Sequence, residues 1–176
     1  FPASARHRPG IGPVTAAAIA AMGEALDRFE IEGVSHNIAF LQAVMDQERF
    51  KAGRLSTAYI AEEFGEGFNG VELGSDIVDD LAAFAVCAGF RLEPSLGDER
   101  AVVMGEKVWR FHVSERDDIF ALDHQGRQVR VAMGWRPGDR LAFVEIAGVE
   151  RVLQVRRITG GFFIRYRGAE LEMKVL

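Results

Sequence analysis

Apolar residues in the first part of the chain recur at spacings of three and four. Ile19, Met22, Leu26 and Phe29 follow this rule, which is the period of a helix with one apolar face. The pattern predicts a helix over 14–29. Capping residues and breakers place three more helices before residue 91. They are expected from Ser35 or Asn37 to Gly53, from Ser56 or Thr57 to Phe64, and from Ile77 to Phe90.

The helix over 77–90 differs from the others because it has no polar face in its second half. Residues 81–88 read Leu-Ala-Ala-Phe-Ala-Val-Cys-Ala, and a helix that is apolar all round is normally buried all round. Another part of the chain must therefore enclose it.

The rest of the chain alternates with a period of two. Seven stretches have strand length: 107–113, 117–123, 127–133, 140–147, 150–158, 162–167 and 170–175. Alternation with one apolar face is typical of antiparallel strands that are half buried, and glycine-rich turns separate them. The predicted fold class is α+β, with a short helical segment followed by a long central helix wrapped by an antiparallel β-barrel. We place the boundary between a helical unit, 1–70, and a helix-plus-barrel unit, 71–176.

The charge distribution changes at a similar place. Residues 1–105 hold eight basic and 16 acidic side chains, whereas 106–176 hold 13 basic and ten acidic ones. The net charge is −5, and the lone cysteine, Cys87, excludes an internal disulfide. No apolar run approaches the roughly 20 residues that span a bilayer. We expect a cytoplasmic protein, or one of the mitochondrial matrix in a eukaryote, without a membrane partner.

Few residues suggest catalysis. The run Gly65-Glu66-Gly67-Phe68-Asn69-Gly70 has the glycines of a dinucleotide loop but follows a helix instead of a strand, so we interpret it as a linker. Cys87 lies in the apolar helix, where a thiol is inert, and no two histidines have ligand spacing. Lys174 sits near a methionine, as in biotin-bearing turns, but fits the outer face of the last strand. We expect no catalytic, cofactor-binding or metal-binding residue.

One alternative function stays open. Arg165 and Arg167 alternate with aromatic residues on a predicted strand, and basic and aromatic side chains on a barrel bind single-stranded nucleic acid in other proteins. The alternative is thus a free-standing barrel that binds such a strand or a small ligand. We favour solvated arginines and no nucleic-acid partner, because the chain as a whole is acidic.

Several motifs resemble one family. Residues 32–41 read Glu-Gly-Val-Ser-His-Asn-Ile-Ala-Phe-Leu, which is similar to a segment near the end of the biotin carboxylase domain of biotin-dependent acyl-CoA carboxylases. Residues 58–64 continue this match. Residues 135–139, Trp-Arg-Pro-Gly-Asp, and 158–169 resemble the α subunit of the propionyl-CoA carboxylases more narrowly. The stretch between the apolar helix and Trp135 is shorter than in the family, so we expect a strand or part of a loop to be missing there.

The resemblance implies a non-catalytic, joining role. The chain would hold the last helices of the biotin carboxylase domain and the domain that joins it to the carboxyltransferase. Biotin, ATP and a divalent metal would belong to the complete subunit, an ATP- and biotin-dependent ligase, and this chain alone would be inactive. The expected partners are the carboxyltransferase β subunit and the remainder of the α subunit.

The resemblance also implies a contact segment, which follows the apolar helix and runs from Arg91 to Met104. In the family this segment hooks onto the β subunit. The expected contact residues are Arg91, Leu92, Glu93, Pro94, Leu96, Asp98, Glu99, Arg100, Val102 and Val103. The simpler alternative is a connector with an early first strand at 101–104.

Overall fold

The computed structural model describes residues 13–29, 31, 36–68 and 70–176. The predicted cap at Ser35 lies outside these residues, as does Asn69 of the glycine-rich run. The helices are α1 (Pro13–Arg28), α2 (Ile38–Asp46), α3 (Glu48–Lys51), α4 (Tyr59–Glu63) and α5 (Ser75–Leu92), followed by a 3-10 turn, Pro94–Leu96. The strands are β1 (Glu99–Met104), β2 (Lys107–Arg116), β3 (Ile119–His124), β4 (Arg127–Met133), β5 (Leu141–Ile146), β6 (Val149–Ile158), β7 (Gly161–Tyr166) and β8 (Ala169–Val175).

The structure describes five helices where four were predicted, and α1 and α5 lie within two residues of their predicted ends. The second predicted helix is divided into α2 and α3 at Gln47, which has an extended backbone. The next helix starts at Tyr59, later than the predicted Ser56 or Thr57. Asn37 occupies the N-cap of α2, but its side chain makes no capping hydrogen bond. Among the described residues, no helix is long and apolar enough to cross a membrane.

The strands form a closed antiparallel barrel in which each strand pairs with its neighbours in sequence. The seam joins β1 to β8 through the pairs Val102–Val175 and Val103–Lys174. Two backbone hydrogen bonds of 2.8 Å between Ala101 and Leu176 extend it. All seven predicted strands are present, and β1 is an eighth. Residues 99–104 supply this additional strand in the stretch where a strand or part of a loop was expected to be missing, and the shortness of that stretch relative to the family stays a prediction.

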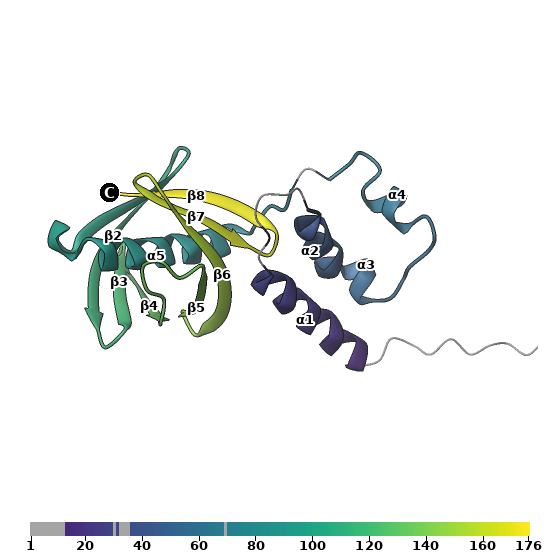
Figure 1. The fold of residues 1–176 in the computed structure, drawn as a ribbon, viewed down its shortest axis with the longest axis horizontal. Helices are drawn as coiled ribbons and strands as arrows, with labels where there is room; N and C mark the ends of the chain where they lie inside the picture. The colour runs from purple at the N-terminus through teal and green to yellow at the C-terminus, as the bar shows by residue number, and fades with distance from the viewer. Residues whose placement is uncertain (1–12, 30, 32–35, 69) are drawn as a thin grey trace, which may run out of the picture.

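Alternate residues of the strands face the interior and are buried. They include Val102, Trp109, Phe111, Val113, Phe120, Leu122, Val131, Met133, Val144, Ile146, Leu153, Phe162, Ile164 and Met173. This is the period-two pattern of the sequence, since adjacent side chains of a strand point to opposite faces. Figure 1 shows the barrel strands on one side of the molecule and α1 to α4 on the other.

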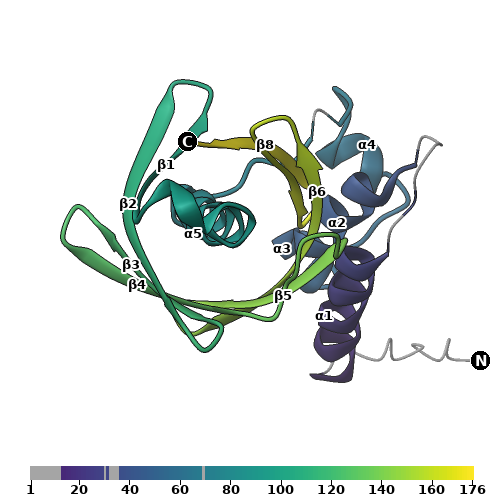
Figure 2. The ribbon, with the colours of Figure 1, turned by 60° about the vertical axis from the view of Figure 1, so that its left-hand side comes forward.

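Helix α5 belongs to the same core. Every residue from Leu81 to Gly89 is buried, and α5 packs against β1, β2, β4, β5, β7 and β8. Figure 2 looks into the barrel, with α5 on the concave side of the strands. At Gly89 a Cβ atom would lie 2.7 Å from Cγ1 of Val175, so only glycine permits this close approach of α5 to β8.

Candidate partner interface

The predicted contact segment is more ordered than a hook-shaped loop. Arg91 and Leu92 are the last residues of α5, and Glu99–Met104 form β1. Only residues 93–98 lie between these elements, and half of them form the 3-10 turn Pro94–Leu96. The early strand that was the simpler alternative is thus present, two residues longer than predicted. The apolar run 101–104 lacks strict alternation, which is why its sequence pattern did not identify it as a strand.

Burial divides the ten expected contact residues into two groups. Glu93, Pro94, Leu96, Asp98 and Glu99 are exposed. The other five are buried or half buried: Arg91, Leu92, Arg100, Val102 and Val103. Val102 and Arg100 occupy inward-facing positions of β1 and are 0% and 5% exposed. The exposed part of the segment, and hence the candidate contact surface, is therefore limited to residues 93–99. The large apolar side chain on this surface is Leu96, which is 62% exposed.

The buried side chain of Arg100 stabilises this exposed segment through hydrogen bonds to its backbone. Its Nη2 donates to the carbonyl of Glu93 at 2.6 Å, and its Nε donates to the carbonyl of Gly97 at 2.9 Å. The guanidinium lies 5.6 Å from the ring centroid of Phe90, on α5. Gly97 has φ +88°, a conformation that favours glycine. The sequence suggested that Arg100 faces a partner, but in the structure it bridges the two ends of the turn.

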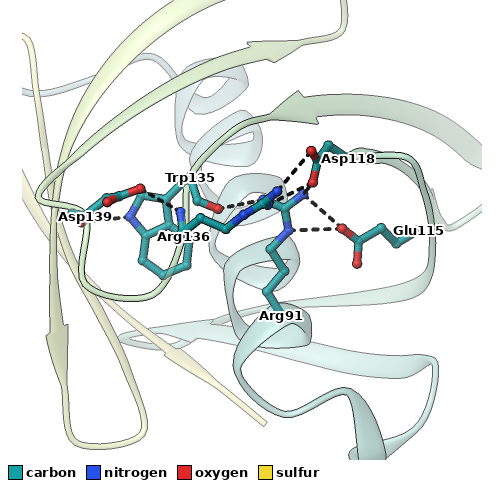
Figure 3. A network of polar contacts seen from close by, with 6 residues as sticks. All are labelled: Arg91, Glu115, Asp118, Trp135, Arg136 and Asp139. Atoms are coloured by element: carbon teal, nitrogen blue, oxygen red, sulfur yellow. Dashed lines mark hydrogen bonds and ion pairs between the residues drawn. The ribbon is translucent and has the colours of Figure 1, made fainter.

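Arg91 fixes the end of α5 to the barrel mouth (Figure 3). Its side chain is 6% exposed. Nε and Nη2 donate to Oε1 of Glu115 at 3.0 and 2.9 Å, and Nη1 donates to the carbonyl of Trp135 at 2.6 Å. Nη2 also reaches Oδ1 of Asp118 at 2.5 Å. One guanidinium thus joins α5, β2 and the loops that follow β2 and β4, consistent with the fork geometry of arginine.

Asp118 extends the network to the β4–β5 loop. Arg136 donates to its two carboxylate oxygens at 2.8 and 3.1 Å. These hydrogen bonds from Arg136, more than the charge of Arg91, lower the pKa of Asp118. In the same loop, the indole of Trp135 donates to the carbonyl of Asp139 at 2.8 Å. Hydrogen bonds and ion pairs between side chains therefore hold together the end of the barrel next to residues 93–98.

A second polar cluster joins the helices to the opposite part of the barrel. Asp27, at the end of α1, accepts a 2.7 Å hydrogen bond from Nε2 of Gln42 on α2 and a 3.0 Å bond from the backbone amide of Arg167. The carbonyl of Asp27 accepts from Nε2 of Gln154 on β6 at 2.9 Å. Burial raises the pKa of Asp27 to about 6, although Arg167 opposes the rise. Sequence patterns missed this cluster because its members are far apart in the chain.

Two adjacent aspartates of α5, Asp79 and Asp80, connect this helix to the barrel. Asp79 accepts from Nζ of Lys107 at 2.9 Å and from the indole of Trp109 at 2.8 Å. Burial opposes the effect of these donors, which together lower the pKa of Asp79. Asp80 pairs with Arg151 at 2.5 Å. Both carboxylates therefore link α5 to strands of the barrel, Asp80 as a largely buried side chain and Asp79 as a half-exposed one.

Other candidate chemistry finds no support in the geometry. Burial raises the pKa of the Cys87 thiol well above its usual value. Lys174 is exposed in mid-ladder, paired with Gly161 and Val103, which does not fit a biotin-bearing turn. Within the described ranges, no three His, Cys, Asp or Glu side chains lie close enough to hold a metal ion.

The two arginines of the nucleic-acid alternative have carboxylate partners within the chain. Arg165 pairs with Glu170 and Arg167 with Asp27. Arg167 also has φ +50° and follows the end of β7, so it does not continue the strand alternation of Arg165. These two side chains therefore do not form a continuous basic track along β7.

Comparison with known proteins defines the class to which this barrel belongs. Residues 92–176 match the family described as the propionyl-coenzyme A carboxylase BT domain, and residues 11–62 match the biotin carboxylase C-terminal domain. The chain therefore belongs to the family of α subunits of biotin-dependent acyl-CoA carboxylases.

Among individual relatives, the propionyl-CoA carboxylase alpha chain of Ruegeria pomeroyi is 40% identical over 178 residues, covering 93% of this chain and 26% of that protein. The mitochondrial propionyl-CoA carboxylase alpha chain of Homo sapiens is 27% identical over 178 residues, covering 90% and 24%. That of Caenorhabditis elegans is 42% identical over 64 residues, covering 36% and 9%. The chain spans about a quarter of the length of the first two proteins.

Proposed function

We propose that this chain is the joining portion of an acyl-CoA carboxylase α subunit, of the propionyl-CoA type. Residues 1–70 would be the last helices of the biotin carboxylase domain with a linker, and residues 71–176 the joining domain. Within this domain, α5 is the long central helix that the barrel wraps. Support comes from the uninterrupted burial of Leu81–Gly89 and from the packing of α5 against strands all around the barrel.

The partner of the joining domain is the carboxyltransferase β subunit. The observation that carries this proposal is the exposed segment 93–99 at the end of α5. Its turn presents Leu96 to solvent and is held by hydrogen bonds from the buried Arg100. An exposed apolar side chain on an ordered turn is the kind of anchor around which interfaces form. Acyl-CoA would bind to the partner, and biotin, ATP and a divalent metal would serve the complete subunit.

Calorimetry with the purified β subunit tests the docking. Leu92 packs against the core, so the replaced segment starts at Glu93: residues 93–97 become a Gly/Ser linker of equal length. We expect the intact chain to bind and the replaced chain not to bind, while both melt cooperatively. A matched control replaces the exposed β5–β6 turn, Ala147-Gly148, with Asn-Gly. Equal affinity of the intact and replaced chains would place the contact elsewhere.

A further inference from the structure

Leu96 and Arg100 differ in how far solvent reaches their side chains. Leu96 is 62% exposed and Arg100 is 5% exposed, although both belong to the same short segment. Arg100 has no carboxylate among its hydrogen-bond partners in the described residues, and its donors go to two backbone carbonyls of its own segment. A buried arginine used in this way acts as a structural clamp, since its planar fork reaches two acceptors in a fixed geometry.

The two carbonyls stand at either end of the 3-10 turn. Glu93 precedes Pro94–Leu96 and Gly97 follows it. The Glu93 carbonyl also accepts the amide of Leu96 at 3.2 Å, and the Asp98 carbonyl accepts the amide of Val113 on β2 at 2.8 Å. Phe90 supports the guanidinium from α5. The turn is thereby tied to β1, β2 and α5 before any partner arrives.

We propose that Arg100 is a positioning residue that preorganises the turn 94–96, so that Leu96 is presented as a preformed anchor to an apolar recess on the partner. The partner therefore meets an ordered turn and does not have to order a flexible loop. Such preorganisation increases affinity by removing the entropic cost of ordering at the moment of binding. This inference rests on the proposed function for the identity of the partner, but the order of the free turn does not depend on it.

Two variants separate the anchor from its support. In Arg100→Lys the charge is kept, but a single ammonium does not reproduce the fork that spans Glu93 and Gly97. In Leu96→Ala the anchor is removed and every contact of Arg100 remains. Arg110→Lys serves as the control, because Arg110 is an exposed neighbour of Ala101 across the β1–β2 pair. Thermal melting of all three verifies that the barrel is intact.

The first readout is amide hydrogen exchange of the free chain, measured by NMR at Leu96 and Val113. Loss of a charge-assisted hydrogen bond changes a local equilibrium by about tenfold or more, so we expect exchange at Leu96 to accelerate by about that factor in Arg100→Lys. In Leu96→Ala we expect the amide exchange rates at Val113 and at position 96 to stay within about twofold of the wild-type rates, because the contacts of Arg100 remain. Unchanged exchange in Arg100→Lys would overturn the role of Arg100.

The second readout is the affinity for the β subunit. We expect Arg100→Lys and Leu96→Ala each to weaken binding by about tenfold, with Arg110→Lys unaffected. A loosened turn with full affinity would show that preorganisation does not contribute to docking. If the wild-type chain fails to bind the β subunit, the proposed function falls, while the exchange measurement still decides whether Arg100 orders the turn.

Discussion

The backbone amide of Arg167 lies 3.0 Å from the carboxylate of Asp27 and donates a hydrogen bond to it. This contact ties the turn between β7 and β8 to the end of α1. The Arg167 guanidinium is a more distant partner, at 3.8 Å from the same carboxylate. Asp27 is therefore held mainly by neutral donors in a site where only 9% of it is exposed.

Protonation of Asp27 is expected to stabilise the fold. Its pKa rises from 3.8 to about 6 through burial, with Asp46 adding to the rise and Arg167 and Gln42 opposing it. The folded state thus binds this proton more tightly than the unfolded chain, so the extra stability is complete below the unfolded pKa and is lost as pH rises through the folded pKa. A shift of this size corresponds to about 3 kcal/mol.

Asp27→Asn isolates this effect. Asparagine keeps an acceptor for Gln42 and for the Arg167 amide but carries no charge. We expect the variant to be at least as stable as the wild type at about pH 7.5. It should lack the increase in the free energy of unfolding that the wild type shows as the pH falls from about 7 to about 4. Chemical unfolding across this range measures the difference, and parallel pH profiles of the two proteins would refute the assignment.

Removal of the Phe84 side chain tests the core around α5. Phe84 is fully buried, and its ring centroid lies 6.2 Å from that of Trp135. Truncation of such a residue leaves a cavity, so Phe84→Ala should lower the free energy of unfolding by about 3–5 kcal/mol. Val108→Ala, at a site that is 43% exposed, is the control. An unchanged melting midpoint for Phe84→Ala would show that α5 is not enclosed.

The barrel mouth depends on the shape of the Arg91 side chain as well as on its charge. In Arg91→Lys one ammonium replaces a fork that reaches Glu115, Asp118 and the Trp135 carbonyl. We expect a loss of about 1–3 kcal/mol in urea unfolding. Arg116→Lys, at a side chain that is 93% exposed, should change stability by less than about 0.5 kcal/mol. Similar losses of unfolding free energy in both variants would mean that the hydrogen bonds of Arg91 do not contribute specifically to stability.

Lys174 should not accept biotin. It lies within β8 with paired strands on both sides, whereas a biotin-bearing lysine needs a protruding turn that a ligase can grasp. After incubation with biotin ligase, ATP and biotin, intact-mass spectrometry should find the unmodified chain. Biotin on Lys174 would require the end of β8 to detach from the barrel.

Local patterns predicted much of the fold because they act over a few residues. The period-two alternation located β2 to β8, and the apolar run 81–88 located the buried part of α5. The strand β1 was left as an alternative because Ala101-Val102-Val103-Met104 does not alternate. Its assignment as a strand depends on pairing with β2 and β8, and pairing partners are not a local property.

Side-chain roles were harder to predict than elements. Arg91 and Arg100 look alike as charged residues after a helix, yet one bridges α5 to the loops at the barrel mouth and the other clamps a turn. Asp27 and Arg167 are separated by 140 positions. No spacing rule connects such residues, because their proximity is created by the closed barrel and by the packing of α1 on β6.

Closure of the barrel also has a consequence for biosynthesis. The seam needs β1 and β8, the first and last strands, and α5 is made before either of them. During translation the apolar helix therefore emerges from the ribosome long before the strand that completes its surroundings. Strand pairings between distant segments form slowly, and until they form, apolar surface and unpaired strand edges stay exposed. We expect the nascent chain to be a substrate for chaperones until residues 169–175 have left the exit tunnel.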